Sequence, residues 1–331
     1  AGYGRSLGFE FGSPFRFWRI LDVLRDGAAA GRKFTVADFE RLQHDEHSVV
    51  SAGIVAALRT ALAEGGARRS PGAGDDADSR SAIAMIAAWD GALSKDSAAA
   101  ALYQAWLPKL KAAIAAAIEP GRASQGRQVQ PTIGDQPLLT LLARAGLRGA
   151  VAAPNPWVEG SPRCRGCQVP TDASAADRAA VRAALTGPAL GDAWRELAGK
   201  LGRDASTWSW GRIHRASFEH ALAGSPALRS VMNLPDVPRG GDSTTPNATG
   251  SGARQTAGAS FRLVIDVADW DRSTTTNVPG ASGQPGSPHY ADLLPLWADG
   301  RYHPLPFSRR AVESNAAHRL MLLPAAARTT R

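Results

Sequence analysis

Apolar residues recur at helical spacing through the first two hundred positions of the sequence. Repeats at i, i+3, i+4 and i+7, preceded by capping residues, predict amphipathic helices. The predicted helices cover residues 14–26, 36–43, 48–63, 81–88, 97–118, 137–145, 174–185 and 189–201. The segments between them that lack this periodicity are a flexible break at 27–31, an exposed polar linker at 65–80 and a loop at 120–136.

Local signals set three of the helix boundaries. Ser13-Pro14 reads as the N-cap and first residue of a helix with Phe15 on its buried side. Thr35 reads as the N-cap of the helix that follows the break. Pro108 predicts a kink or a boundary inside 97–118, so we expect a pair of helices there.

The pattern changes after Asp204, where tryptophans, glycines and β-branched residues become frequent. Residues 235–258 read as a long loop rich in Gly, Ser, Thr, Pro and Asn. Residues 261–267 alternate in a way that predicts a strand with at least one buried face. A helix capped by Ser308 and a short strand at 319–323 are the last predicted elements.

A glycine- and proline-rich run at 279–286 can form neither a helix nor a central strand, so it predicts a shaped loop. Ser287-Pro288 then reads as a helix start. The helix carries the stripe Tyr290, Leu293, Leu294 and Trp297, and Pro295 should kink or shorten it. The sequence therefore predicts an α+β protein, with a mainly helical region at 1–204 and a mixed closing segment at 205–331.

Composition excludes several classes of function. The content of 44% hydrophobic and 21% charged residues is typical of a globular protein. A net charge of +8 comes from arginines spread along the whole chain, so no basic block indicates nucleic-acid binding. No run of about 18 apolar residues predicts a membrane span. The sequence shows no signal peptide and no initiating Met, so we expect its natural N-terminus to lie elsewhere.

The two cysteines, Cys164 and Cys167, form a C-x-x-C pair among prolines and glycines, which predicts a loop. A local disulfide in an oxidising compartment and a free thiol pair are both compatible with this spacing. The run His44–His47 contains four residues of metal-ligand types, but only His44 and His47 could share a helix face, so it predicts no zinc site. Asn247-Ala248-Thr249 matches a glycosylation acceptor, a pattern that is common by chance.

No self-contained active site is visible in the sequence. A G-x-S-x-G nucleophile elbow, an H-E-x-x-H zinc motif and a phosphate-binding glycine loop are all missing.

Several other motifs along the chain, none of them a complete active site, together resemble those of one protein family. They include the run Gly280–Phe307, preceded by Trp208–Gly211, His214, Phe218, His220–Leu222, Gly240–Asp242, Gly258–Arg262 and Asp266. Further upstream they include Gln43 with Asp45 and Ser48, Trp89–Gly91, Ala101–Tyr103 and Trp106. In order and spacing they resemble the penicillin acylase (penicillin amidase) family of N-terminal-nucleophile hydrolases. The resemblance implies the C-terminal portion of an αββα Ntn-hydrolase fold and a packing or hydrogen-bonding role for Gln43, Asp45 and Ser48.

The resemblance also implies an activity. Members of the family hydrolyse the amide bond between an acyl group and an amine, with an N-terminal serine as nucleophile and its α-amino group as base. An α-amine suits that role because its ordinary pKa is about 7.7–8.0. That serine and an oxyanion-hole asparagine would lie upstream of this sequence, so we expect the chain alone to be inactive. The implied partners are the upstream parts of the same precursor and a small acyl-amide substrate.

The substrate class stays open between a β-lactam antibiotic side chain and an acyl-homoserine lactone. A non-catalytic homologue or scaffold is the alternative from another class of function. The resemblance further implies a periplasmic or secreted protein, without nucleic acid or membrane as a partner.

The resemblance assigns a supporting catalytic role to one residue of this chain. In the family an arginine lies at the start of the helix that follows the oxyanion-hole asparagine, close to the active site. The spacing places this arginine at Arg16, where its fork could orient the asparagine or bind a substrate carboxylate. A surface arginine on an amphipathic helix is the alternative. The family also implies a structural calcium ion with ligands mostly outside this chain. Arg5 occupies the position of one such ligand, and a cation cannot coordinate calcium.

Overall fold

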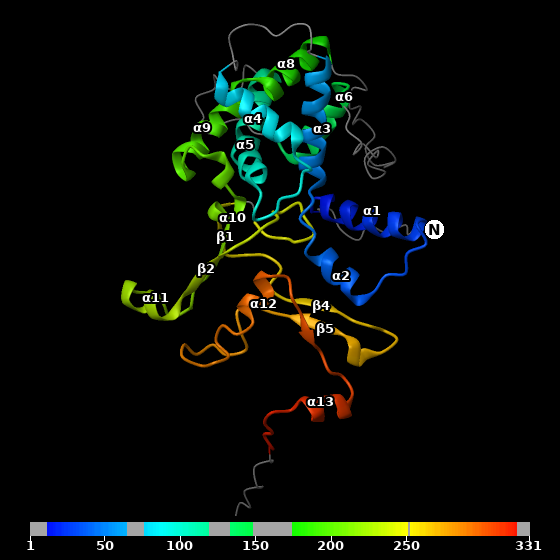
Figure 1. Ribbon diagram of the computed structural model, residues 1–331, viewed down its shortest axis with the longest axis vertical. Helices are drawn as coiled ribbons and strands as arrows, with labels where there is room; N and C mark the ends of the chain where they lie inside the picture. The colour runs from blue at the N-terminus through cyan, green and yellow to red at the C-terminus, as the bar shows by residue number, and fades with distance from the viewer. Residues whose placement is uncertain (1–11, 65–75, 119–132, 148–173, 251, 323–331) are drawn as a thin grey trace, which may run out of the picture. The chain divides into compact units, whose positions relative to one another are not determined.

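The computed structural model describes residues 12–64, 76–118, 133–147, 174–250 and 252–322. Its first part is helical, as predicted, and Figure 1 shows the order of the elements. The helices of this part are α1 (Phe15–Ala29), α2 (Val36–Gln43), α3 (Val49–Glu64), α4 (Ala77–Ala88), α5 (Ala98–Ile118), α6 (Asp135–Arg144), α8 (Ala175–Thr186), α9 (Pro188–Leu201) and α10 (Trp210–Ile213).

Short strands and helices alternate in the rest of the chain. They are β1 (Arg215–Phe218), α11 (Pro226–Met232), β2 (Leu234–Pro238), β3 (Arg254–Gln255), β4 (Arg262–Val264), β5 (Thr274–Thr276), α12 (Leu294–Ala298), β6 (His303–Pro304) and α13 (Arg309–Asn315). Two 3-10 turns accompany them, η1 (Ala205–Thr207) and η2 (Trp270–Arg272). This mixture confirms the predicted α+β class.

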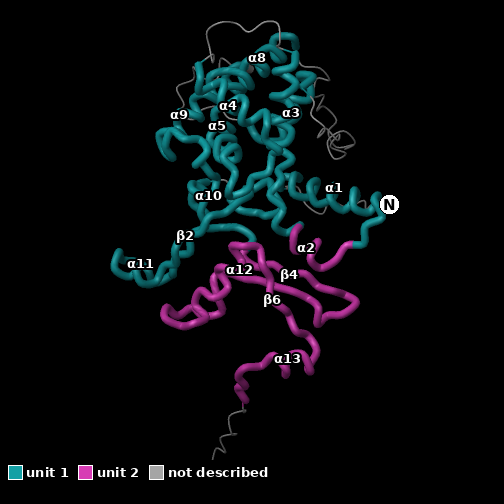
Figure 2. The backbone as a smooth tube through the Cα atoms, viewed as in Figure 1, with its two compact units in different colours: residues 1–33, 42–259 teal, residues 34–41, 260–331 magenta. Residues whose placement is uncertain are grey.

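The chain divides into two compact units, coloured separately in Figure 2. Unit 1 comprises residues 1–33 and 42–259, and unit 2 comprises residues 34–41 and 260–331. The division at residue 204 that composition suggests stays a prediction. None of the described helices is long and apolar enough to cross a membrane.

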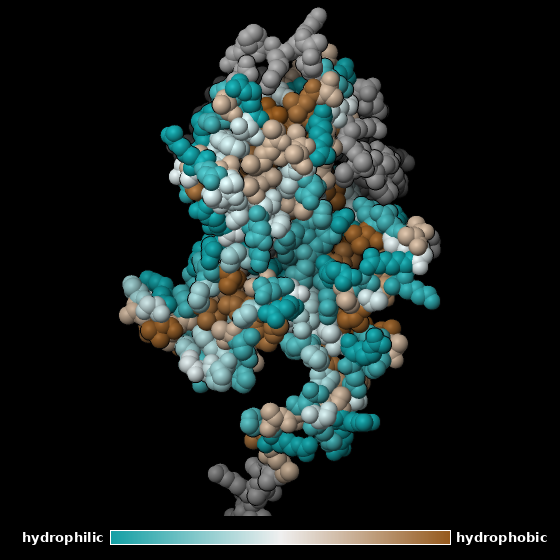
Figure 3. All heavy atoms as spheres, in the orientation of Figure 1, coloured by the Kyte–Doolittle hydropathy of each residue, from teal (hydrophilic) through white to brown (hydrophobic). Residues whose placement is uncertain are grey.

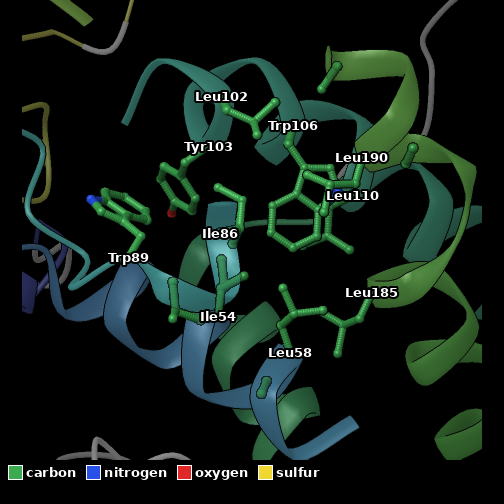
Figure 4. Packing of buried hydrophobic residues seen from close by; sticks show 14 of the residues in the cluster. Ile54, Leu58, Ile86, Trp89, Leu102, Tyr103, Trp106, Leu110, Leu185 and Leu190 are labelled. Atoms are coloured by element: carbon green, nitrogen blue, oxygen red, sulfur yellow. The ribbon is translucent and has the colours of Figure 1, made fainter. Parts of the chain in front are cut away.

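The core of unit 1 lies among helices. The helix α5 packs against α8 and α9, α4 packs against α9, and α3 packs against α6 and α8. Figure 4 shows how side chains from α3, α4 and α5 point toward one another in this core. Trp106 and Leu110 of α5 and Ile54 of α3 are fully buried there. The alanines of α5, such as Ala100 and Ala101, let neighbouring elements approach closely.

Local capping explains several helix starts. Thr35 caps α2 as predicted, because its hydroxyl accepts a hydrogen bond from the Asp38 N–H at 3.3 Å while the Asp38 carboxylate accepts from the Thr35 N–H at 2.8 Å. Ser174 and Asp177 form the same reciprocal box at the start of α8. These boundaries follow from residues three positions apart.

The prediction for the start of α1 was wrong. The N-cap is Pro14 rather than Ser13, and no side chain caps the helix. The helix also continues through Gly27, inside the predicted break, to Ala29. Ala28 and Ala29 favour the helix, and the turn that follows it includes Gly31, where a φ of 71° favours glycine.

Three other predictions need correction in unit 1. The predicted linker 65–80 ends earlier than expected, because Asp76 caps α4 by accepting from the Ser79 N–H at 2.8 Å. Residues 97–118 form one helix with Pro108 inside it, not a pair. The helix α6 begins at Asp135, two residues before the predicted start. The remainder of the linker, at 65–75, lies outside the described residues.

A small sheet of unit 1 has the strand order β2-β1-β3. Strand β1 pairs antiparallel with β2 and parallel with β3. The connection between β1 and β2 forms an arm that ends in α11 (Figure 1). No residue of α11 is buried, and Leu222 and Val231 of this arm are 67% and 71% exposed. Hydrophobic surface is visible on the arm in Figure 3.

The predicted loop 235–258 is largely a buried segment of irregular backbone. Its first residues belong to β2, and 254–255 form β3. Between these strands the chain buries polar side chains, namely Arg239, Asp242, Thr244, Thr245, Asn247 and Thr249. Buried polar groups need partners, so the hydrogen bonds of this segment decide its conformation.

Unit 2 contains an antiparallel sheet of order β4-β5-β6. Strand β4 is shorter than the predicted strand 261–267, and residues 319–322, predicted as a strand, form none and are exposed. The helix capped by Ser308 is confirmed as α13.

The helix predicted from Ser287-Pro288 begins only at Leu294, as α12. Proline cannot donate to the preceding turn, so Pro295 is tolerated only in the first turn of this short helix. Leu294 and Trp297 are buried as the apolar stripe predicts. The upstream run 279–286 is irregular, as predicted.

Candidate functional site

Arg16, the predicted supporting residue, is the second residue of α1, and its side chain is exposed. Its neighbour Phe15 is buried and meets the ring of Trp18 edge-on, with ring centroids 5.6 Å apart. This aromatic contact anchors the first turn of α1 and leaves Arg16 accessible. The catalytic role of Arg16 stays a prediction.

A second arginine of the same helix, Arg19, makes the stronger contact. Its Nε and Nη2 atoms lie 2.8 and 2.6 Å from Oδ2 of Asp45. The other oxygen of Asp45 accepts from the His47 N–H at 2.8 Å. Burial opposes ionisation of Asp45, but the hydrogen bonds from His47 and Arg19 outweigh it and lower the pKa of this carboxyl. The imidazole of His47 also contacts Asp45, with its Nδ1 atom 3.3 Å from Oδ1, and this side-chain contact raises the pKa of His47.

Glu46 connects this region to the segment that follows β2. Oε1 of Glu46 accepts from Nδ2 of Asn247 at 3.0 Å, and Oδ1 of Asn247 accepts from Nη2 of Arg239 at 2.6 Å. Burial raises the pKa of Glu46, although Asn247 and Arg239 act in the opposite direction. A Cβ atom on Gly240 would lie 2.0 Å from Oε1 of Glu46, so an alanine here would have to displace the carboxylate that binds Asn247.

Ser48 makes a second connection between the same two segments. Its Oγ lies 2.6 Å from Oγ1 of Thr244, which donates to Oδ1 of Asp242 at 2.6 Å. Because the Thr244 proton points to the carboxylate, the Ser48 hydroxyl donates to Thr244. Oδ2 of Asp242 accepts from Nε2 of Gln104 at 2.8 Å. The neighbouring Tyr103 is fully buried, which raises its pKa well above the ordinary value, with the charge of Asp242 adding to the effect.

His214 contacts both ends of the segment that follows β2. Its Nδ1 lies 2.8 Å from the Arg239 carbonyl oxygen and its Nε2 2.9 Å from the Gly250 carbonyl oxygen. The ring stacks on Trp210 with centroids 4.4 Å apart. A neutral imidazole has a single N–H, so it can donate to only one of the two carbonyls. Burial lowers the pKa of His214, against the opposing effect of these hydrogen bonds.

These side chains form one buried polar network, which joins the α2–α3 connection to the segment after β2. Its members are Asp45, Glu46, Ser48, His214, Arg239, Asp242, Thr244 and Asn247. The hydrogen-bonding role predicted for Asp45 and Ser48 is confirmed. Sequence reasoning missed the partners of both, because nothing local pairs position 45 with 19 or position 48 with 244.

The network is a scaffold rather than a catalytic constellation. The Ser48 hydroxyl accepts from the N–H groups of Val50 and Ser51, both at 3.2 Å, and donates to Thr244, so it caps α3. His214 faces two carbonyl oxygens and not a hydroxyl. Within the network no nucleophile is paired with a base. Its hydrogen bonds instead hold the backbone of the two segments in one conformation.

Metal-ligand residues do not gather in the described part of the chain, where no group of three or more His, Cys, Asp and Glu could hold an ion. The buried carboxylates of the network are bound to Asn, Gln, Thr and Arg side chains. These residues therefore do not fit the structural calcium ion that the resemblance implies. Arg5, at the position of one expected ligand, lies outside the described residues.

Unit 2 has a buried cation that sequence reasoning also missed. Arg262 is 3% exposed, and its guanidinium carbon lies 5.4 Å from the centroid of the Trp297 ring. Burial of the nearby Tyr302 raises its pKa to about 12, against the opposing charge of Arg262. The stripe that contains Trp297 gave no sign of this contact. The alternation of 261–267 instead indicated that the face with Phe261 and Ile265 would be buried, whereas the structure buries the face with Arg262.

Two other features of the sequence are the glycosylation pattern and the cysteine pair. Asn247 is 1% exposed, so it is no acceptor for glycosylation in the folded protein. The pair Cys164 and Cys167 lies outside the described residues.

Comparison with known proteins identifies the family. The profile of the penicillin amidase family matches residues 1–314. A penicillin acylase 2 proenzyme from a Pseudomonas species (strain SE83) is 39% identical over 121 residues, which are 35% of this chain and 16% of that protein. The acyl-homoserine lactone acylase QuiP of Pseudomonas syringae pv. syringae is 25% identical over 350 residues, covering 98% of this chain.

The matched relatives are longer than this chain, which spans 38% of the length of the QuiP protein. A solved penicillin G acylase from Alcaligenes faecalis has 18% sequence identity and a TM-score of 0.50, over 98% of this chain and 55% of the other. That likeness concerns the fold, and it agrees with the mixed helices and small sheets described above. The family match covers the motifs that build the buried polar network, and the chain belongs to the penicillin amidase family.

Proposed function

We propose that this chain is the C-terminal part of the catalytic chain of an acylase, which hydrolyses the amide bond between an acyl group and an amine. The observation that supports this most directly is the family match over residues 1–314. It includes the segments 45–48 and 239–249, whose side chains hold one another in the buried polar network. The chain would thus supply the scaffold and not the reacting groups.

In this proposal the nucleophile is an N-terminal serine outside this chain, and its α-amino group is the base. The serine hydroxyl attacks the amide carbon, its proton passes through the α-amine to the leaving amine, and water then hydrolyses the acyl ester. A backbone N–H and an asparagine side chain, also outside this chain, stabilise the oxyanion. The lack of a nucleophile–base pair within the network is consistent with this division of labour.

Two substrate classes have support from relatives. The higher identity, over a third of the chain, is to a penicillin acylase, which favours a β-lactam side-chain amide. The longer matches, over 98% of the chain, are to acyl-homoserine lactone acylases, which favour an N-acyl lactone as the second candidate. Both are small acyl amides. A non-catalytic homologue is the alternative if the serine has been lost.

Arg16 is the residue of this chain that we propose to assist catalysis, through a forked hydrogen bond to the oxyanion-hole asparagine or to a substrate carboxylate. Its exposed position on the first turn of α1 leaves the guanidinium accessible for such a contact. The proposal includes the upstream parts of the precursor as partners and a periplasmic or secreted location.

The test is to express the complete gene product and the 331-residue chain in parallel. The complete protein should hydrolyse a chromogenic acyl anilide, and a penicillin and an N-acyl homoserine lactone should be compared as substrates. The chain alone should show no turnover. Activity of the chain alone, or a complete protein that lacks both the serine and activity, would contradict the proposal.

A further inference from the structure

Helix α1, which the structure describes in full, is joined to the core of unit 1 only near its start. Phe15 is its one buried residue, and Trp18 packs partly against the same core. Along the rest of the helix none of residues 22–29 is buried. A segment with few buried apolar contacts moves easily, so a further contact is needed to fix the orientation of α1.

The ion pair between Arg19 and Asp45 supplies that contact. Arg19 lies four positions after Phe15, so the two side chains leave the same face of the helix. Two guanidinium nitrogens approach one carboxylate oxygen, Nε at 2.8 Å and Nη2 at 2.6 Å. The side chains of Arg19 and Asp45 are 30% and 11% exposed, so water screens the pair only in part. The pair therefore fixes the rotation of α1 about its own axis.

Asp45 is itself held by the buried polar network. Its carbonyl oxygen accepts from the N–H of Asn247 at 2.9 Å, and its Oδ1 accepts from the N–H of His47 at 2.8 Å. Asn247 in turn is fully enclosed and bound to Glu46 and Arg239. The carboxylate thus has a fixed base, and the helix is the part that the ion pair orients.

The orientation of α1 decides where Arg16 lies. Arg16 and Arg19 are three positions apart, so they are neighbours on the helix surface. A rotation that moves Arg19 away from Asp45 also displaces Arg16. Side chains extend to about 5–6 Å from a helix axis, so a rotation of about 10° shifts their ends by about 1 Å.

We propose that Arg19 and Asp45 are positioning residues of the acylase reaction, which orient α1 so that Arg16 reaches the active site. This inference rests on the proposed function, in which Arg16 assists catalysis. It gives the buried polar network a second role, because the network then sets the geometry of a residue that meets the substrate or the oxyanion-hole asparagine. A misplacement of about 1 Å can cost up to about 100-fold in rate, so loss of the ion pair should be visible in the kinetics.

The test is a double-mutant cycle on the complete protein with Asp45→Asn and Arg16→Ala, read as kcat and KM for an acyl anilide. Asp45→Asn keeps the shape of the side chain and removes its charge. It should impair, by about tenfold, the same kinetic constant that Arg16→Ala impairs. In a protein that already carries Arg16→Ala it should change that constant by less than about twofold, because no guanidinium remains to be positioned.

Further variants show whether the two residues act as a unit. Arg19→Gln should reproduce the effect of Asp45→Asn, and the two substitutions together should cost no more than either alone. Arg19→Lys, which retains the charge without the fork, should recover part of the loss. Asp22→Asn, the same chemical change at an exposed aspartate of α1, is the matched control and should leave both constants unchanged.

Amide hydrogen exchange of the same variants gives a readout that does not depend on activity. Asp45→Asn should accelerate exchange in α1 several-fold relative to exchange in α5, which lies in the helical core. Unchanged exchange in α1 would mean that the ion pair does not hold the helix and would overturn the proposal.

The kinetic results can also overturn it. If Asp45→Asn impairs the reaction equally with and without Arg16, it acts through folding or through another residue. Unchanged constants for Arg16→Ala would likewise leave nothing to be positioned. An inactive wild-type complete protein would refute the proposed function and the catalytic part of this inference, and exchange would then decide separately whether the ion pair holds α1.

Discussion

Asn247 is the side chain on which the buried polar network depends most, because it binds two charged groups at once. Its amide donates to Glu46 at 3.0 Å and accepts from Arg239 at 2.6 Å, and Asn247 and Arg239 are 1% and 3% exposed. The substitution Asn247→Ala removes both contacts and leaves a carboxylate and a guanidinium without them. We expect a large loss of stability from this single change.

The magnitude follows from the two hydrogen bonds. A hydrogen bond to a charged group contributes about 1.5–3 kcal/mol, and an unsatisfied buried partner costs a similar amount. Glu46 is only partly buried and can turn toward water, so the expected loss is about 2–4 kcal/mol rather than the full sum. Asn247→Asp keeps the acceptor for Arg239 but opposes a carboxylate to Glu46, so its loss should grow as the pH rises above the pKa of Glu46.

The assay is urea unfolding of the 331-residue chain, followed by tryptophan fluorescence. The indole of Trp210 donates to the Gly241 carbonyl at 3.2 Å, so it reports on this segment. Asn315→Ala, on the exposed helix α13, is the control, with an expected change within about 0.5 kcal/mol. If Asn247→Ala loses less than about 1 kcal/mol, the network does not hold the segment and the reasoning is wrong.

Three further predictions concern glycines, imidazoles and the supporting arginine. Gly240→Ala should lose about 1–3 kcal/mol by overpacking against a carboxylate, whereas Gly199→Ala, inside α9 with open space, should gain about 0.5–1 kcal/mol in the same urea assay. NMR titration should give His47 a pKa above 6.5 and His214 one below it. The stability from His47 is then present below about 6.5 and lost as the pH rises through its folded pKa, whereas that from His214 is present above about 6.5 and lost as the pH falls through its folded value. Arg16→Ala in the complete protein should lower kcat at an unchanged melting temperature. If replacing another exposed arginine of α1 lowers kcat equally, Arg16 has no specific role in catalysis and is an ordinary surface residue.

The parts of the fold that the sequence predicts are those decided by neighbouring residues. Thr35 and Ser174 cap their helices through partners three positions away, so α2 and α8 have nearly the predicted bounds. Residues 319–322 failed as a strand because strand pairing requires a partner that local pattern does not reveal. The start of α12 was misplaced because Pro295 outweighed the apolar stripe.

The candidate site was less predictable for the same physical reason. The resemblance indicated that Asp45 forms hydrogen bonds, but its partner Arg19 lies 26 positions away, and Asn247 lies 201 positions from Glu46. The burial of Arg262 contradicts the usual preference of a charged side chain for water. Only the folded arrangement shows that the ring of Trp297 lies against it.

The long sequence separation of these contacts has a consequence for how the protein folds. The bond between Glu46 and Asn247 closes a loop of 201 residues, and the bond between Gln104 and Asp242 closes one of 138. Closure entropy rises only logarithmically with length, by about 0.6 kcal/mol per doubling, so these loops remain thermodynamically accessible. They cannot close before both ends have been synthesised and the helices between them have collapsed. We therefore expect the segment after β2 to dock late, so that substitutions in it accelerate unfolding more than they slow folding.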